Sequence, residues 1–146
     1  MNLAVRRTPV HRAFTLIELI AVIIVLAILS GIAIPKYIDY ADRAKESSCK
    51  GTLGATRSGI ANFYANSAVT GTPTYPTLVQ LQTFGAAGVM QEAIPPNPFV
   101  TGATATDIAA AVWAATPPVS GTNGWNYDAS NGKFWPNSNV LGENAW

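Results

Sequence analysis

Residues 12–34 read RAFTLIELIAVIIVLAILSGIAI. From residue 14 onward, the only polar side chains in this stretch are those of Thr15, Glu18 and Ser30. A helix of these 21 residues would be about 31 Å long at 1.5 Å per residue. This length matches the hydrocarbon core of a bilayer, so the stretch predicts a membrane-spanning helix.

The unusual member of this helix is Glu18. An ionised carboxylate is costly inside a membrane helix, and such a residue is retained mainly for a function. The alternative is that Glu18 lies close enough to the helix end for its carboxylate to reach lipid headgroups or water. The segment in front of the helix favours the functional interpretation.

This segment, residues 1–13, is a short basic leader. It contains three arginines and no acidic residue, the pattern that keeps a segment on the cytoplasmic side of a membrane. The small residue Ala13 precedes Phe14 at the predicted membrane boundary, where a peptidase facing the cytoplasm could cut. A cut at this bond would free an α-amino group on Phe14, four residues before Glu18.

The N-terminal segment resembles the signature of type IV prepilins and type II secretion pseudopilins. The resemblance rests on the sequence FTLIEL at residues 14–19, on the basic leader in front of it and on Pro35 behind it. It implies that a prepilin peptidase cuts between Ala13 and Phe14 and methylates the new amino group of Phe14. The family usually has glycine before the cut, so Ala13 is a departure that bears on the efficiency of processing.

The same features also fit an ordinary secretory signal, with Gly31-Ile32-Ala33 as a cleavage site of small residues. The apolar run is longer than the roughly 7 to 15 residues of such a signal, and Pro35 follows the site closely. The mass of the mature chain separates the two interpretations, because a cut after Ala13 keeps the apolar helix and a cut after Ala33 removes it.

An apolar spacing of three to four residues continues beyond the membrane segment and predicts one helix to about residue 65. Pro35 lies inside this helix, where its ring and its missing N–H act against the carbonyl of Gly31. Glycine is itself a poor helix former, so the turn from Gly31 to Pro35 is the predicted helix break, which kinks or melts. The predicted organisation is a leader at 1–13, a membrane half of the helix at 14–34, a soluble half at 35–65 and a globular part at 66–146.

The globular part is predicted to contain a short helix at 77–84 and a proline-rich crossing loop at 95–99. Aromatic side chains alternate in Gly124–Asp128 and in Lys133–Trp135, and Asn131-Gly132 supplies a turn between them. We therefore expect a C-terminal hairpin that partly buries four aromatic side chains against the helix. With the N-terminal resemblance, this predicts an α+β fold, a pilin-like lollipop in which the long helix packs on a small antiparallel sheet.

Little in the composition points to catalysis. The only histidine, His11, lies in the leader, so the processed chain would have none for a catalytic triad or a histidine-based zinc site. The sequence contains no phosphate-loop motif and no Cys-x-x-Cys pair. The single cysteine, Cys49, cannot form an intrachain disulfide and is expected to be a small buried residue of the helix. We therefore predict that the protein is not an enzyme.

A candidate calcium site lies in the predicted hairpin turn. Asn126, Asp128, Ser130 and Asn131 offer oxygen donors of the kind that calcium prefers. The family resemblance adds that major pseudopilins hold calcium in a C-terminal loop. Only Asp128 is charged, however, and these residue types are also ordinary turn formers. The sequence leaves both interpretations open, and no other cofactor is expected.

The resemblance implies a structural subunit of a type II secretion pseudopilus or of a type IV pilus-like filament. In such a homo-oligomer, the carboxylate of Glu18 would neutralise the amino group of Phe14 on a neighbour, so that neither charge is buried alone. The implied partners are prepilin peptidase and an inner-membrane assembly platform, with the globular part periplasmic or extracellular. Without the leader, six basic residues face eight acidic ones, so no nucleic-acid partner is expected.

Two other functions stay open on the sequence alone. The chain could be a minor pseudopilin at the filament tip, or a membrane-anchored exported domain that binds a ligand as a monomer. Stoichiometry separates these functions, because a filament subunit is present in many copies and crosslinks to itself through its apolar helix.

Overall fold

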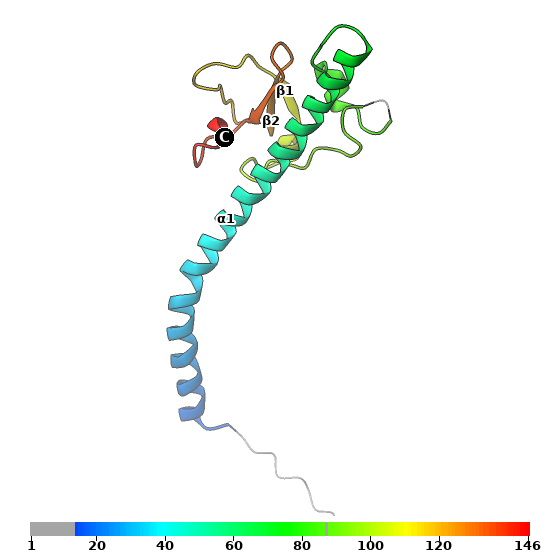
Figure 1. Ribbon diagram of the computed structural model, residues 1–146. Helices are drawn as coiled ribbons and strands as arrows, with labels where there is room; N and C mark the ends of the chain where they lie inside the picture. Colours follow the sequence, from blue (N-terminus) through cyan, green and yellow to red (C-terminus); the bar gives the residue numbers. More distant parts are fainter. Residues whose placement is uncertain (1–13, 87) are drawn as a thin grey trace, which may run out of the picture. The chain divides into compact units, whose positions relative to one another are not determined.

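The computed structural model describes residues 14–86 and 88–146, and the chain divides into two units between Ala41 and Asp42 (Figure 1). The first unit is formed by the beginning of helix α1, which runs from Leu16 to Thr70. The second unit contains the rest of α1, a short helix and a three-stranded sheet. A long helix combined with a small sheet confirms the predicted α+β fold class.

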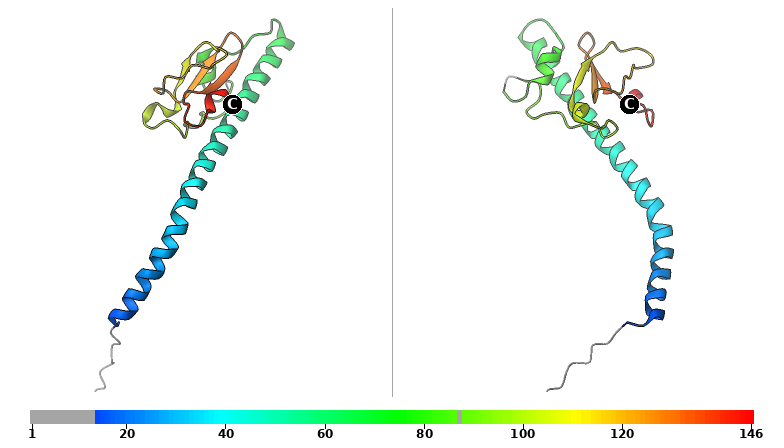
Figure 2. Two further views of the ribbon diagram at one scale, coloured as in Figure 1. Left: turned by 90° about the vertical axis from the view of Figure 1, so that its left-hand side faces the viewer. Right: turned by 180° about the vertical axis from the view of Figure 1, so that it is seen from behind.

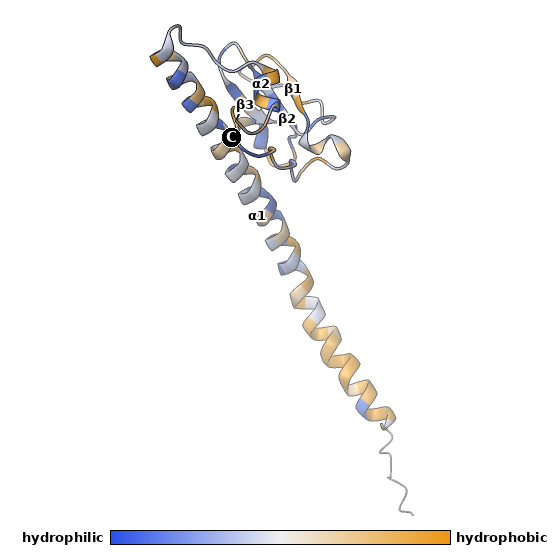
Figure 3. Cartoon of the chain, turned by 90° about the vertical axis from the view of Figure 1, so that its right-hand side faces the viewer, coloured by the Kyte–Doolittle hydropathy of each residue, from blue (hydrophilic) through white to orange (hydrophobic). Residues whose placement is uncertain are grey.

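In the first unit, the ribbon of α1 is coloured as hydrophobic over most of its length (Figure 3). The large apolar side chains from Leu16 to Ile34 are 42–77% exposed. The turn from Gly31 to Pro35, which the sequence predicted to kink or melt, is part of the continuous helix. A proline removes only one backbone hydrogen bond, and the bonds of the adjoining turns hold the single chain in helical form.

In the second unit, the sheet and its loops lie alongside α1 (Figure 2). The helix packs on them through a stripe that recurs every three to four residues and consists of Cys49, Leu53, Thr56 and Ile60. The helix ends at Thr70, later than the predicted residue 65. Ser67 explains the difference, because its hydroxyl donates to the carbonyl of Tyr64 and accepts from the amide of Thr74, which ties the following loop to the last turns.

Three short strands form a mixed sheet in the order β1-β2-β3. Strands β2 (Trp125–Asp128) and β3 (Lys133–Pro136) pair antiparallel, which confirms the predicted hairpin. Strand β1 (Ile108–Ala110) pairs parallel to β2, so the expectation of a purely antiparallel sheet is wrong. The connection 111–124 is the reason, because it is long enough to carry the chain back along the sheet before β2 begins.

Aromatic side chains of the hairpin form the centre of the core. These side chains are Trp125, Tyr127, Phe134 and Trp135, and each is at most 1% exposed. Their burial is more complete than the partial burial that the sequence predicted. Their polar atoms are satisfied by carbonyls of the surrounding loops. Pro95 and Pro118 each accept from a tryptophan indole at 3.0 Å, and Pro76 accepts from the tyrosine hydroxyl at 2.7 Å. The proline-containing loops therefore close the core as well as connecting its elements.

Helix α2 (Leu78–Gln82) lies where the sequence predicted a short helix. Thr77 and Gln80 form a reciprocal cap at its start, and Leu81 is fully buried. Two short 3-10 helices follow later in the chain, η1 at Ala103–Thr106 and η2 at Glu143–Ala145.

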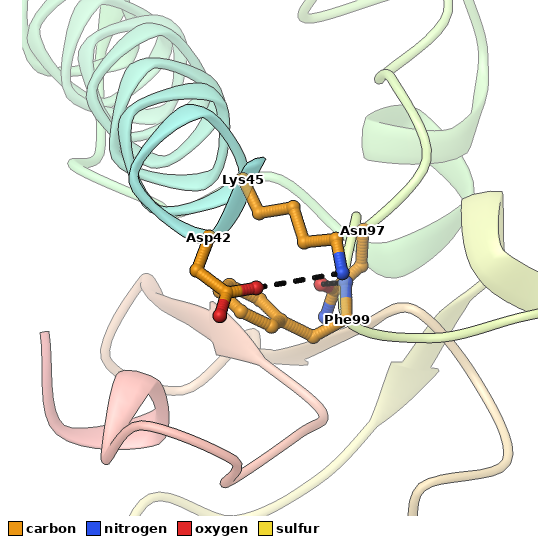
Figure 4. A network of polar contacts seen from close by, with 4 residues as sticks. All are labelled: Asp42, Lys45, Asn97 and Phe99. Atoms are coloured by element: carbon orange, nitrogen blue, oxygen red, sulfur yellow. Dashed lines mark hydrogen bonds and ion pairs between the residues drawn. The ribbon is translucent and has the colours of Figure 1, made fainter. Parts of the chain in front are cut away.

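The predicted crossing loop at 95–99 is fixed by Asn97, which is 1% exposed. Its amide nitrogen donates to the carbonyl of Gly124 at 2.8 Å and to the hydroxyl of Ser138 at 3.0 Å. Its amide oxygen accepts from the backbone of Phe99 at 2.9 Å (Figure 4). The loop is thereby bonded to the residue before β2 and to the segment after β3, and the partly buried Phe99 packs against the core.

Candidate functional site

Thr15 and Glu18 form a reciprocal cap at the start of α1. The Thr15 amide and hydroxyl both donate to Oε2 of Glu18, at 2.8 and 2.9 Å, and the Glu18 amide donates to the Thr15 hydroxyl at 3.3 Å. This capping box satisfies backbone N–H groups that the start of a helix otherwise leaves without partners. The sequence interpretation assigned no role to Thr15, although the Thr-x-x-Glu spacing is a recognisable signal for this cap.

The cap orients the Glu18 carboxylate without enclosing it. Among the residues that the structure describes, the hydrogen bonds to this carboxylate end on Oε2 alone. The second oxygen, Oε1, is therefore available to a further donor. Phe14, whose amino group is the expected partner, is 87% exposed. Ala13 and the leader at 1–13 lie outside the described residues, so the cut stays a prediction.

The helix behind the cap is long and apolar enough to cross a membrane. Its apolar 18-residue window has a mean hydropathy of 2.9, and none of that window is buried within the chain. Exposed apolar surface is unfavourable in water by about 25 cal/mol per Å². This surface therefore requires a cover of lipid or of other apolar helices.

The candidate calcium ligands take part in a hydrogen-bonded turn. Asp128 accepts from the hydroxyl and the amide of Ser130 at 2.6 and 3.0 Å, from the amide of Trp113 at 2.9 Å and from the side chain of Asn131 at 3.0 Å. These bonds, with the Ser130 hydroxyl foremost, hold the pKa of the carboxyl below its usual value. Because a carboxylate has about four lone-pair sites, all of them are used within the turn.

This arrangement does not fit calcium unless the turn rearranges. Ser130 and Asn131 direct hydrogen-bond donors at Asp128, and Asn126 donates its amide hydrogens to other groups. Elsewhere in the described part of the chain, no three His, Cys, Asp or Glu side chains gather in a way that could hold a metal ion. The observed contacts therefore favour the interpretation of these residues as turn formers.

Cys49 lies in the core, as the sequence predicted. Its side chain is fully buried, and this burial raises the pKa of the thiol to about 11. The thiolate is the reactive form of cysteine, and a thiol with this pKa contains very little of it at neutral pH. Cys49 therefore contributes packing rather than reactivity.

Two polar residues that the sequence did not reveal hold the C-terminal segment, the buried Glu143 and the half-buried Arg57. Glu143 is fully buried and accepts from the amides of Val140 at 2.9 Å and Leu141 at 2.6 Å. Burial raises the pKa of this carboxyl, but the backbone hydrogen bonds outweigh burial and leave the pKa below its ordinary value. Arg57 donates from α1 to backbone carbonyls of β3 and of Trp146. The partners of Arg57 lie 77 and 89 residues away in the sequence, so no local pattern marks it. The amides bound by Glu143 are two and three residues away, and only the burial of its carboxylate depends on the fold.

Comparison with known proteins finds similarity to a prokaryotic N-terminal motif and to type IV pilins. A family model described as the prokaryotic N-terminal methylation motif matches residues 9–34. The type IV major pilin protein PilA of Myxococcus xanthus is 40% identical over 60 residues, which are 41% of this chain and 27% of that protein. The fimbrial protein EcpC of Eikenella corrodens is 37% identical over 60 residues, which are 41% of this chain and 39% of that protein.

A third relative is PilA5 of Thermus thermophilus, a type IV narrow pilus major component, which is 42% identical over 50 residues. Those residues are 34% of this chain and 43% of PilA5, so each match spans less than half of the relative's own length. No solved structure matches the chain significantly. The chain thus carries the prokaryotic N-terminal methylation motif and is, through its N-terminal segment, a relative of the type IV pilins.

Proposed function

We propose that this chain is a structural subunit of a membrane-derived filament of the type IV pilus or type II secretion pseudopilus kind. The start of α1 supports the proposal most directly. The Glu18 carboxylate is held in place there by Thr15 through one of its oxygens, and its other oxygen is open. The apolar helix that follows is not covered by the rest of the chain. The relatives named above are pilus and fimbrial proteins. The methylation motif at residues 9–34 contains both features.

The proposed maturation takes place in the inner membrane. The leader at 1–13 stays on the cytoplasmic side, and the second unit lies in the periplasm. A prepilin peptidase cuts between Ala13 and Phe14, and the new amino group of Phe14 is methylated. The methylation motif at 9–34 includes this bond and supports the processing step.

Assembly on an inner-membrane platform then replaces lipid around the apolar helices with neighbouring helices. In this dry environment, Glu18 pairs with the amino group of Phe14 on a neighbouring copy. Each charge would be expensive to bury alone, and the pair compensates both. Oε1 accepts the new bond while Oε2 stays in the cap with Thr15, so the start of the helix keeps its structure. The pairing sets the axial register of the copies.

A secretion pseudopilus and a surface pilus share this chemistry and differ in the machine that builds them. Deletion of the chain separates them, because loss of a pseudopilus subunit stops the export of secreted proteins and loss of a pilus subunit removes surface filaments. A minor subunit at the tip would be recognised by its low copy number, and a monomeric ligand-binding domain by the absence of self-crosslinking through α1.

The variant Glu18→Ala tests the pairing. We expect it to be inserted and processed normally but to be missing from filaments, because the amino group of Phe14 would be left without a partner in the helix bundle. Ser30→Ala, which removes another polar side chain of the same segment, is the matched control and should assemble. Incorporation of Glu18→Ala at the level of the control would refute the pairing.

Processing is tested separately by the intact mass of the mature chain. The expected mature protein begins at Phe14 and carries one additional methyl group, and replacement of Ala13 by tryptophan should leave a heavier, uncut precursor. A mature protein that still begins at Met1 would contradict the proposal.

A further inference from the structure

Two grooves run beside the part of α1 that packs on the sheet. The first, of about 470 Å³, is called the basic groove here and is lined by Arg57 and Ala61 of the helix and by Tyr75, Trp113, Lys133 and Trp146. The second, of about 670 Å³, is called the acidic groove and is lined by Ala55, Ser58 and Asn62 of the helix and by Val89, Met90 and Glu92. Both grooves lie within the second unit.

The two grooves lie on opposite flanks of α1. Successive residues of a helix are about 100° apart around its axis, and the buried stripe that includes Leu53 and Ile60 marks the direction of the core. With this spacing, Arg57 and Ala61 fall on one side of the stripe and Ala55 falls on the other. A copy of the chain can therefore offer the two grooves to two different neighbours at once.

The charges of the two grooves are opposite. The basic groove contains Arg57 and Lys133 and no acidic residue, whereas the acidic groove contains Glu92 and no basic residue. Ion pairs between side chains in residues 14–86 and 88–146 join Asp42 to Lys45, as in Figure 4, and Glu46 to Lys50. Lys133 and Glu92, both exposed, take part in neither pair. Glu92 is thus open to a partner of opposite charge outside its own chain. Lys133, whose Nζ lies 5.5 Å from the centre of the Trp113 ring, likewise has no carboxylate partner among the described residues.

The basic groove has the composition of a protein interface. Tyrosine, tryptophan and arginine are enriched where proteins meet, and they dominate the binding energy there. The basic groove contains half-buried Tyr75, Trp113 and Trp146, and the acidic groove offers half-buried, apolar Val89 and Met90 opposite them. Charges beside such apolar surface add register to a hydrophobic contact when they meet charges of opposite sign.

We propose that the basic groove of one copy docks on the acidic groove of the next, with Lys133 of the first copy paired to Glu92 of the second. The contact is heterologous, because the two surfaces that meet are different. A contact of this kind repeats without closing when its rotation does not complete a ring, and it then builds an open helical array. The inference rests on the proposed filament function and adds to it a lateral contact outside the apolar helices.

Mixed disulfide crosslinking of full-length chains tests the contact. Cells express a Glu92→Cys chain and a Lys133→Cys chain together, with different tags, and sheared filaments are oxidised. We expect a disulfide-linked dimer that carries both tags, and no such dimer from either variant alone, because like positions do not meet in a heterologous contact. The native Cys49 is buried and does not interfere. A pair of Asp107→Cys and Lys133→Cys chains is the control and should not crosslink, because Asp107 lines neither groove.

Charge reversal gives a second measurement. Glu92→Lys and Lys133→Glu should each lower the filament yield about fivefold, the effect of roughly 1 kcal/mol per contact, and the double variant should restore it. Normal filaments without the mixed dimer, or single reversals without effect, would overturn the groove contact and leave the proposed function standing. If the unsubstituted chain forms no filament in the cell envelope, the proposed function fails and the groove contact fails with it.

Discussion

Replacement of Glu143 by glutamine tests how the C-terminal segment is held on the second unit. The carboxylate is fully buried, and its two oxygens accept separately from the amides of Val140 and Leu141. Glutamine has nearly the same shape but offers only one acceptor atom. Whichever way its amide turns, one backbone N–H is left facing an NH2 group inside the protein.

The expected loss of stability follows from this count. A hydrogen bond to a charged acceptor contributes about 1.5–3 kcal/mol, and a buried N–H without a partner costs a similar amount. We therefore expect Glu143→Gln to destabilise the second unit by about 2–3 kcal/mol at pH 7. For a unit of this size, about 4 °C of melting temperature corresponds to 1 kcal/mol, so the melting temperature should fall by about 8–12 °C.

The assay is thermal unfolding of the full chain in detergent, followed by the fluorescence of the buried Trp125 and Trp135. Glu46→Gln is the matched control, because it removes the same charge from an exposed ion pair with Lys50, and it should change the melting temperature by no more than about 2 °C. If Glu143→Gln melts within the range of the control, the assignment of Glu143 as the anchor of this segment is wrong.

The pH dependence gives an independent check on the same residue. The pKa of Glu143 is lower in the folded chain than its ordinary value of 4.5. Such a carboxyl contributes stability that is present above pH 4.5 and is lost as the pH falls through the folded-state pKa. The difference in the free energy of unfolding between wild type and Glu143→Gln should therefore be constant near neutral pH. It should become smaller as the pH falls into the acid range.

Three further predictions concern the rest of the second unit. Addition of a calcium chelator should leave the melting temperature unchanged, because the turn at Asp128 is satisfied internally, and a clear downward shift would revive the calcium site. Gly132→Ala should lower the free energy of unfolding by at least about 1–2 kcal/mol, because φ is +70° at this residue and the new Cβ would lie 2.4 Å from the ring of Tyr75. Gly54→Ala is the control, since there is open space around it, and it should be neutral or stabilising in the same thermal unfolding experiment. Iodoacetamide should label Cys49 only after unfolding, and rapid labelling of the native chain would show that the thiol is accessible.

The long helix, the hairpin and the short helix α2 could be predicted because each depends on neighbours in the sequence. The apolar spacing around Cys49 and Leu53 repeats with the period of a helix, and the alternation of aromatics in β2 and β3 repeats with the period of a strand. The Asn131-Gly132 turn supplies the backbone geometry that joins the two strands. The carboxylate of Glu18 and the apolar helix are likewise local features, and both lie within the N-terminal methylation motif.

The parallel pairing of β1 could not be predicted in this way. Ile108 and Trp125 become neighbours only after residues 111–124 have crossed over, and no local period encodes that path. The burial of Asn97 has a similar cause, since its partners Gly124 and Ser138 lie 27 and 41 residues away.

The sequence by itself therefore determined the long apolar helix, the N-terminal methylation motif and the position of Glu18 within it, because these are properties of contiguous residues. Only the tertiary structure determined which polar groups are buried and which flanks of α1 remain open. Glu143 binds amides only two and three residues away, but it is a buried anchor rather than a surface charge because the fold packs its segment against the rest of the second unit. Lys133 and Glu92 line different grooves because distant segments pack on opposite sides of one helix.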